Sequence, residues 1–370
     1  MGVMLAPTMS RQETVDPQDA RVRMPSPEAI NAYYQAMRRF WHPVMAAHDL
    51  PENRPVAAVL LEEEIVLARL NGSVVAMQDL CRHFQAKLSL GEVRPVAGAG
   101  DCLMCPYHGW SYATDGRCVD IPQLSTNRQI PADAQVPTYY AAERYGLIWV
   151  CLDPEPLYGI PDLPYVEDPS FLTGPLRTYA PWVASAPRVI MAALDDTHGP
   201  WVHEGLVGDR ANPAPPDHHV SSEGRNILVR ITMLQPVNPT IAEAGMANGL
   251  QEVHLVTTVG LPNTIHFTIR AAGSQRVTLI WQAVCPVRYN ETLTFWGSSR
   301  NYDVDKPAFN PEFEAMQDTL REQDRRIVES QRPWLLPPFW TKLELPLRPA
   351  DLPLIEYQRR LEELGIALTV

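Results

Sequence analysis

Two short segments of the chain pair a cysteine with a histidine at spacings suited to an iron–sulfur cluster. Cys81 and His83 form a Cys-x-His pair, and after residues 84–104 Cys105 and His108 form a Cys-x-x-His pair. Two thiolates can bind one iron of a [2Fe–2S] cluster and two imidazoles the other, and the neutral imidazoles raise the reduction potential above that of an all-cysteine cluster. We therefore predict a [2Fe–2S] cluster held by these four side chains, with each pair on its own tight loop.

A zinc knuckle is the alternative for the same region. Cys102 and Cys105 have zinc-like spacing, and Cys81 with a histidine would complete the ligand set. The two Cys–His pairs, and the Gly109-Trp110 that follows the second, favour the cluster, which leaves Cys102 near the site as a non-ligand. The other cysteines are expected to be buried apolar side chains: Cys118, Cys151 and Cys285.

Two histidines and an aspartate lie close together further along the chain. His198 and His203 are five positions apart, about 140° around an ideal helix, so one straight helical face cannot present both. We expect the helix to break at Gly199-Pro200 and turn His203 toward the same metal ion. Asp195 and His198, three apart, would share a face. Two histidines plus one carboxylate can hold Fe(II) and leave positions open for O₂ and a substrate.

The bulk composition narrows the class of protein. The chain has 370 residues, enough for two cores, with 45% hydrophobic and 20% charged residues as in ordinary globular proteins. Its 31 basic and 43 acidic residues give a net charge of −12, which disfavours nucleic-acid binding. There is no apolar run of membrane-spanning length and no secretory signal, so we predict a cytoplasmic protein without membrane attachment.

The first half of the chain has the pattern of a small β domain. Residues 1–25 are polar and without periodicity, which predicts a disordered arm. A helix should follow, with Ser26 as its cap and Pro27 in its first turn. Residues 26–155 are then predicted to form one domain around the Cys/His pairs. Its strand candidates are 56–60, 64–70, 74–79 and 145–152.

The second half of the chain has the pattern of a helical stretch followed by strands and then by helices. A proline-rich passage, 154–181, marks a junction, and residues 182–209 hold a helical stretch. Strand candidates follow at 226–233, 252–259, 264–270, 276–284 and 291–297, and helical patterns at 312–330 and 354–364. Strands followed by helices predict an α+β fold: an antiparallel β domain, then a catalytic domain over 156–370 with an antiparallel sheet covered by helices.

Both groups of residues resemble motifs of one family. The segment from Cys105 to Trp110, followed by Ser111-Tyr112, resembles the oxygenase branch of the Rieske proteins, and Asp195 to His203 resembles their Asp-x-x-His-x-x-x-x-His segment. The resemblance covers roughly residues 35–365. It is strongest to the demethylase and monooxygenase subgroup, which includes methylxanthine N-demethylases and vanillate and dicamba O-demethylases.

The resemblance implies further roles. The region around Asp324 is similar to the family's C-terminal helix, which implies that Asp324 is the third iron ligand. Its competitors are Asp303, Asp305 and Asp318. Asp195 would bridge a cluster histidine, His108, of one subunit and His198 of its neighbour, which implies a homotrimeric ring. Asp196 is a second possible bridge, but its spacing to His198 is wrong. Ala192 stands where the family often has asparagine, so a polar group near the iron is missing.

The implied activity is that of an oxygenase component. It would activate O₂ at Fe(II) to hydroxylate a small aromatic or heterocyclic molecule, or to remove an N- or O-methyl group from it. Electrons would come from an NAD(P)H-dependent reductase, directly or through a ferredoxin, by way of the [2Fe–2S] cluster. Two alternatives stay open: a hydroxylase of an aliphatic or natural-product substrate without demethylation, and a Rieske electron-transfer protein without oxygenase activity.

Overall fold

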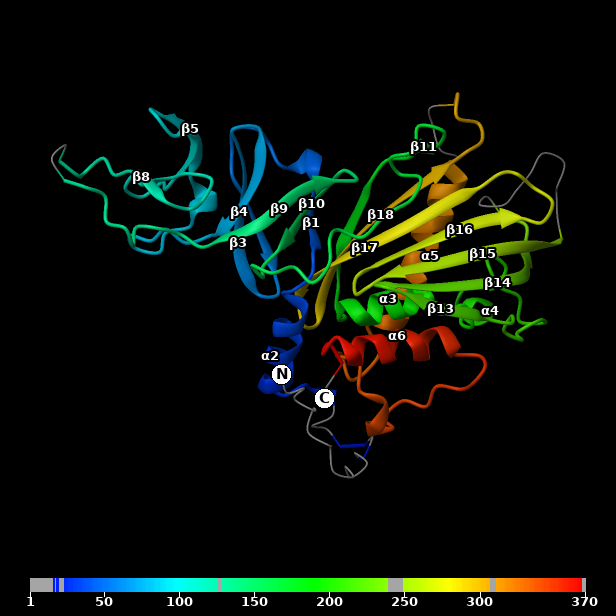
Figure 1. Cartoon of the computed structure of the whole chain (residues 1–370). Helices are drawn as coiled ribbons and strands as arrows, with labels where there is room; N and C mark the ends of the chain where they lie inside the picture. Colours follow the sequence, from blue (N-terminus) through cyan, green and yellow to red (C-terminus); the bar gives the residue numbers. More distant parts are fainter. Residues whose placement is uncertain are drawn as a thin grey trace, which may run out of the picture.

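The computed structural model describes residues 16, 18–19, 23–125, 128–238, 249–306 and 311–367. Most of the predicted disordered arm, 1–25, therefore lies outside the described residues. Figure 1 shows an elongated molecule with small sheets at one end and a large, twisted sheet with its helices at the other. Both parts are antiparallel, which confirms the predicted α+β class. Within the described residues, no helix is both long and apolar enough to span a bilayer.

The first part consists of two sheets. A six-stranded sheet has the order β1-β10-β9-β4-β3-β2, and a four-stranded sheet the order β5-β6-β7-β8. The strands of the six-stranded sheet are β1 His42–Ala46, β2 Val56–Leu60, β3 Glu63–Leu70, β4 Ser73–Gln78, β9 Thr138–Arg144 and β10 Leu147–Cys151. The smaller sheet contains β5 Glu92–Val96, β6 Gly100–Met104, β7 Ser111–Tyr112 and β8 Cys118–Asp120, and short 3₁₀ turns lie at Ala47–Asp49 and Leu88–Leu90.

The predicted strands of this part are present, with small shifts at their ends. The largest shift is in β10, which starts at Leu147 because Tyr145 and Gly146 have positive φ angles (58° and 72°) and form the turn from β9. The segment between the two Cys–His pairs forms the β5–β6 hairpin. Pro95 is accommodated there because β5 is an edge strand, where a missing N–H costs no ladder bond.

The large sheet has the order β11-β18-β17-β16-β15-β14-β13, and β12 also pairs with β18. Its strands are β11 Leu172–Thr173, β12 Arg177–Trp182, β13 His219–Glu223, β14 Asn226–Pro236, β15 Leu250–Gly260, β16 Thr264–Ala271, β17 Thr278–Arg288 and β18 Glu291–Arg300. All five strands predicted here are found, each extending beyond its predicted C-terminal end. The sequence patterns missed the edge strands β11, β12 and β13, two of which lie in the proline-rich passage.

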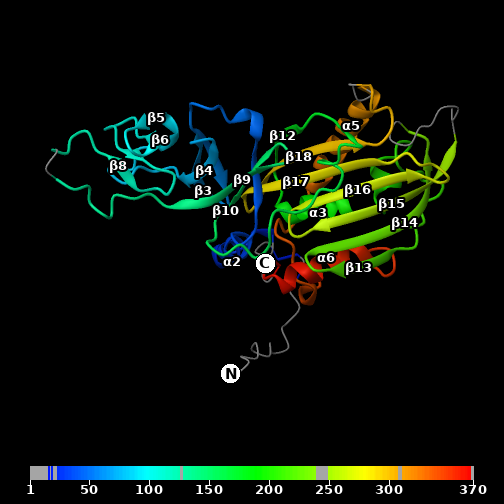
Figure 2. The same ribbon diagram turned by 45° about the horizontal axis from the view of Figure 1, so that its top comes forward.

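The helices are α2 Pro27–Met37, α3 Ala186–Leu194, α4 Gly199–Val202, α5 Pro311–Val328 and α6 Leu352–Glu363, with a 3₁₀ turn at Phe339–Thr341. Helices α3, α5 and α6 lie beside the large sheet (Figure 2). Helix α3 contacts β16, β17, β18 and α5, whereas α6 contacts α3, β13 and β14. Alternate side chains of β17, such as Ile280 and Gln282, face α3 and α5 and line a cavity between the sheet and these helices.

The helix break near the histidines differs from the prediction. Helix α3 ends at Leu194, and Asp195 already has extended backbone angles (φ −72°, ψ 120°). Helix α4 then begins at Gly199, with Pro200 in its first turn. Proline starts a helix here instead of breaking one, since the first turn needs no N–H donor. Asp195 and His198 therefore do not share a helical face, and that part of the prediction is wrong.

A buried histidine joins the N-terminal segment to the large sheet. Helix α2 is capped as predicted, with the Ser26 hydroxyl accepting from the Ala29 N–H at 3.1 Å. In β1, His42 Nε2 donates to the Met37 carbonyl at 2.8 Å, and its Nδ1 accepts from the Asn263 amide at 2.7 Å. Asn263 lies in the turn between β15 and β16, and one hydrophobic cluster continues through both parts of the molecule. The domain division 26–155 and 156–370 stays a prediction.

Candidate metal centres and the adjoining cavity

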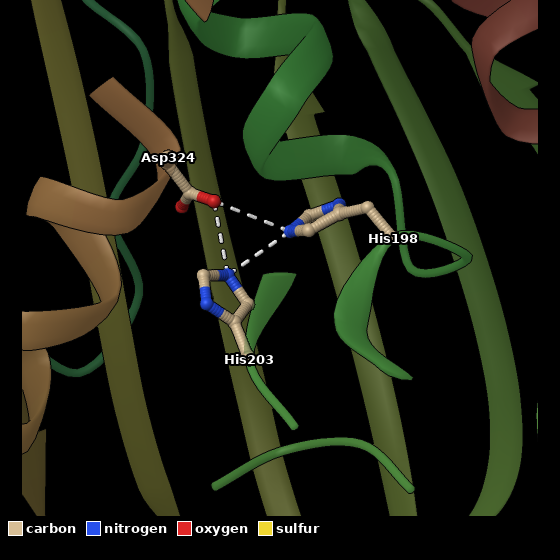
Figure 3. A group of neighbouring side chains, drawn as sticks. All are labelled: His198, His203 and Asp324. Atoms are coloured by element: carbon tan, nitrogen blue, oxygen red, sulfur yellow. Dashed lines mark hydrogen bonds and ion pairs between the residues drawn. The ribbon is translucent and has the colours of Figure 1, made fainter. Parts of the chain in front are cut away.

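His198, His203 and Asp324 converge on one point (Figure 3). The two Nε2 atoms are 3.0 Å apart, and Asp324 Oδ1 lies 2.9 Å from His203 Nε2 and 3.3 Å from His198 Nε2. Among the residues that the structure describes, no other group of three histidine, cysteine or acidic side chains has its ligand atoms within 4.8 Å of one another. Two imidazole nitrogens and one carboxylate oxygen form the donor set that suits non-heme Fe(II).

Two helices position these three side chains. His198 immediately precedes α4 and His203 immediately follows it, so one helical turn brings both imidazoles to the same side. Asp324 reaches them from the C-terminal half of α5. The competing carboxylates point elsewhere. Asp318 pairs with Arg177 at 2.7 Å, Asp303 pairs with Lys306 at 3.1 Å, and Asp305 is exposed.

Each histidine has a second partner on its other nitrogen. Asp195 Oδ2 lies 3.6 Å from His198 Nδ1, and Asp195 is itself fixed by Thr197, whose N–H and hydroxyl both donate to Oδ1 at 2.8 Å. His203 Nδ1 donates to Gln323 Oε1 at 2.8 Å. These contacts direct both Nε2 atoms toward the shared point. Sequence reasoning missed Gln323, because a glutamine beside an aspartate on a polar helix is too common to stand out.

The electrostatics of this group favour a bound cation. Burial opposes charge on Asp324, but its contacts with His198 and His203 outweigh this and lower the pKa of its carboxyl. Burial also lowers the pKa of His198, yet Asp195 and Asp324 together raise it to about 10. Two carboxylates thus compensate one positive charge on the imidazole. A metal ion at the shared point can replace that proton, which is the usual coupling of metal binding to deprotonation.

The first group of predicted residues lies on two loops between the small sheets. Cys81 and Cys105 are buried and their thiols are neighbours, and the rings of His83 and His108 lie 4.7 Å apart. The first loop closes through Cys81 N–H to the Ala86 carbonyl at 2.8 Å. The second closes in the same way, from the Cys105 N–H to the Trp110 carbonyl at 2.8 Å. Two such loops can enclose a cluster from opposite sides.

An orphaned nitrogen supports the cluster at this site. His83 Nδ1 is buried, and no described residue hydrogen-bonds to it. A buried polar atom without a partner is costly, and coordination to iron would satisfy it. The ring of His83 also stacks on Trp110 at 4.5 Å, and the Tyr112 hydroxyl lies 3.1 Å from Cys81 Sγ. The residues present therefore fit a [2Fe–2S] cluster.

The zinc alternative does not fit the geometry. Ligand sulfurs around one tetrahedral zinc ion lie within about 4 Å of one another, given Zn–S bonds of about 2.3 Å. In the described part of the chain, Cys81, Cys102 and Cys105 form no such group with a histidine. The Cys102 thiol instead donates to the Gly100 carbonyl at 3.6 Å. The remaining cysteines are buried, as expected: Cys118, Cys151 and Cys285.

A cavity of about 210 Å³ adjoins the three converging residues. It has room for several water molecules, and hence for one small organic molecule. Its walls are mainly apolar side chains of the large sheet: Val229, Ile231, Met233, Val253, Leu255, Phe267, Ile269 and Ile280. Ala192 lines it with a methyl group, so no polar group is present at that position. Asp196, the second possible bridge, also lines the cavity, and its carboxylate pairs with His218 at 2.8 Å.

Comparison with known proteins agrees with this architecture. Residues 40–139 match the model of the Rieske [2Fe-2S] domain, and residues 182–367 match that of the vanillate O-demethylase oxygenase C-terminal domain. Methylxanthine N1-demethylase NdmA of Pseudomonas putida is 30% identical over 90% of this chain and 91% of its own length. Methylxanthine N3-demethylase NdmB from the same organism is 27% identical over 80% and 82%.

Solved structures show the same relationship. NdmA with caffeine superimposes with a TM-score of 0.76 at 28% identity, covering 90% of this chain and 93% of that one. Dicamba monooxygenase bound to dicamba shares the fold, with a TM-score of 0.70 at 21% identity over 89% and 97% of the two chains. The chain therefore belongs to the Rieske non-heme iron oxygenases, which use a [2Fe–2S] cluster and a mononuclear Fe(II) site, and within them to the group that contains the N- and O-demethylases.

Proposed function

We propose that this chain is the oxygenase component of a demethylase that removes an N- or O-methyl group from a small aromatic or heterocyclic compound. The observation that carries the proposal is the convergence of His198, His203 and Asp324 beside a small, mostly apolar cavity. The similarity to two methylxanthine N-demethylases over most of the chain supports the reaction type. Oxidation of the methyl carbon consumes O₂, two electrons and two protons, and it releases formaldehyde and water.

The proposed ligands of the cluster are Cys81, His83, Cys105 and His108, and those of Fe(II) are His198, His203 and Asp324. When bound, the cluster supplies electrons one at a time and the iron activates O₂. The protein's own side chains position the iron ligands and the substrate. Asp195 and Gln323 hold the two iron-site imidazoles in the tautomer whose Nε2 lone pair faces the shared point. The mainly apolar walls of the cavity offer a surface on which the ring of a small substrate can pack.

The proposed assembly is a homotrimeric ring. Asp195 would accept from His198 in its own subunit and from His108 of the partner subunit. Figure 1 supports an arrangement between subunits, since the small sheets that carry the cluster loops and helix α5 lie in different parts of the molecule. We also propose a cytoplasmic location, and an NAD(P)H-dependent reductase, with or without a ferredoxin, as the electron donor.

Metal analysis on anaerobically purified protein is the first test. About three irons and two acid-labile sulfides per chain are expected, from one cluster and one mononuclear ion. His198→Ala should lose about one iron and keep the sulfide. If the wild type holds about two irons and takes up no further Fe(II), the mononuclear site is refuted and an electron carrier remains.

Turnover distinguishes the two oxygenase reactions. With a reductase, NADH and a panel of methylated aromatic and heterocyclic compounds, formaldehyde should appear in step with substrate loss. An alcohol product that retains every methyl group would instead identify the chain as a hydroxylase. His198→Ala serves as the control, because it removes the iron site and leaves the cluster in place.

A further inference from the structure

One positive charge in the cavity has no carboxylate in direct contact. The acidic residues that line the cavity each have a partner: Asp195 contacts His198, Asp196 pairs with His218, and Asp324 contacts both His198 and His203, with which it forms the triad of proposed iron ligands. Arg321 also lines the cavity, but no carboxylate of the described residues lies within 4.0 Å of its guanidinium. Its hydrogen bonds go to the carbonyl and side-chain oxygens of Gln317, both through one terminal nitrogen.

The guanidinium is held in a fixed position. Its central carbon lies 4.2 Å from the centre of the Trp296 ring, and that ring is almost fully buried. The Trp296 indole N–H donates to the Tyr179 hydroxyl at 2.5 Å, and Tyr179 in turn bonds to Asp318. This stacked arrangement leaves the other terminal nitrogen and Nε of Arg321 without a hydrogen-bond partner among the described residues. A guanidinium fixed this way is ready to make a planar, two-pronged contact.

A cation in this setting needs a partner. Burial lowers the pKa of Arg321 to about 10, although nearby Tyr179, Asp324 and Asp318 oppose this, so the side chain still carries its charge at neutral pH. Charged groups removed from water are costly unless they are paired. Stacking on Trp296 compensates only part of that cost. The cavity is the direction from which a pairing anion can arrive.

We propose that Arg321 binds a carboxylate of the substrate, so that the substrates are small methylated aromatic or heterocyclic acids. This inference rests on the proposed function and names its substrate class. Arg321 and Asp324 are three residues apart and share one face of α5. The carboxylate thus docks one helical turn from the triad, and the apolar sheet face holds the ring between them. Arg321 is a specificity-determining residue, and neutral substrates lack the group that it recognises.

Matched pairs of probes test this without turnover. The affinities of 2-, 3- and 4-methoxybenzoate and of the corresponding methoxybenzamides are measured by calorimetry on the iron-loaded enzyme under nitrogen. For at least one pair the wild type should bind the acid about ten- to 150-fold more tightly than the amide, the range expected for a charge-assisted bond. Arg321→Gln should abolish this preference and leave amide binding nearly unchanged.

Two further variants control for charge and folding. Arg325→Gln removes an arginine of the same helix that is already paired with Glu322 and Glu329, and it should keep the full preference. Arg321→Lys keeps the charge without the planar fork, and it should keep a reduced preference even if Arg321→Gln folds poorly. Iron and sulfide contents must match the wild type in each variant.

The outcomes separate this inference from the proposed function. If no acid binds more tightly than its amide, or if Arg325→Gln loses the preference as Arg321→Gln does, the role of Arg321 is refuted. Formaldehyde release from neutral ethers together with such a result leaves the demethylase standing. Conversely, an acid preference that depends on Arg321, without formaldehyde release, refutes the demethylase and keeps the anion site.

Discussion

Acidification should weaken the joint between the N-terminal segment and the large sheet through His42. Its ring is fully buried, with Nε2 donating to Met37 and Nδ1 accepting from Asn263, so it fits only in the neutral form. Burial lowers its pKa from 6.5 to about 4, against the opposing effect of the Met37 carbonyl. The unfolded chain takes up a proton as the pH falls through 6.5, whereas the folded chain does not until about 4. The contribution of His42 to the free energy of unfolding is therefore fully present above about pH 7.5, and it is lost as the pH falls from 6.5 to about 4.

The size of the effect follows from these two pKa values. Between pH 7.5 and pH 5 the linkage relation gives a loss of about 2 kcal/mol, and the limit below pH 4 is about 3.4 kcal/mol. An unfolding entropy of about 2.1 cal/mol/K per residue amounts to about 0.8 kcal/mol/K over 370 residues. His42 alone should thus account for about 2.5 °C of the decrease in Tm between pH 7.5 and pH 5.

Differential scanning calorimetry on wild type and His42→Gln checks this. The variant will be less stable at both pH values, but its decrease in Tm between them should be smaller than the wild type's by about 2.5 °C. His48→Gln is the matched control. That ring is 70% exposed, so its surroundings change little on unfolding and the decrease should stay at the wild-type value. If His42→Gln shows the same decrease in Tm as the wild type, the buried neutral histidine is not the cause.

Three further changes test the metal centres. Asp324→Ala should lose about one iron per chain while keeping the visible spectrum of the cluster, and loss of sulfide as well would contradict separate sites. Gln323→Leu removes the acceptor of His203 and should weaken Fe(II) binding about ten- to 100-fold in an anaerobic titration, whereas Gln323→Glu should retain it. Tyr112→Phe removes the hydroxyl beside Cys81 Sγ and should lower the cluster potential by about 40–60 mV in a redox titration followed by EPR, and an unchanged potential would show that the contact does not reach the cluster.

Local spacing was enough to predict the two Cys–His pairs and the pair His198 and His203. The Cys–His pairs sit on short loops, so their geometry depends on few neighbours, and the triad histidines are separated by a single turn of helix. Asp324 could be predicted only through a resemblance, because most strands of the large sheet lie between it and His203 in the sequence. Arg321 and Gln323 gave no signal, since their importance depends on which face of α5 meets the cavity.

The fold was predictable where one face of a strand is buried and the alternation is long. That holds for β14 and the first half of β15, where buried and exposed side chains alternate. Strands β17 and β18 are buried almost throughout and were predictable from their apolar content. Apolar side chains of β14 to β17 line the cavity. Edge strands such as β12 and β13 were not predicted, because partly exposed edge strands carry few apolar residues and β12 includes Pro181. The start of α4 was predicted wrongly because a proline can either end a helix or begin one. In the structure α3 has already ended before Asp195, so Pro200 begins a new helix.

The small sheets that carry the cluster loops and the large sheet with α4 and α5 form different parts of the molecule, which has a consequence for mixed assemblies. In the proposed ring, each complete electron path combines the cluster of one subunit with the iron of the next. A subunit with His108→Ala and a subunit with His198→Ala would each form an inactive ring, yet they can complement each other when refolded or co-expressed together. Random mixing in equal amounts restores the path at about one junction in four, because the donor must be of one kind and the acceptor of the other. Activity recovered by mixing two inactive variants would thus show that electrons pass from the cluster of one subunit to the iron of another.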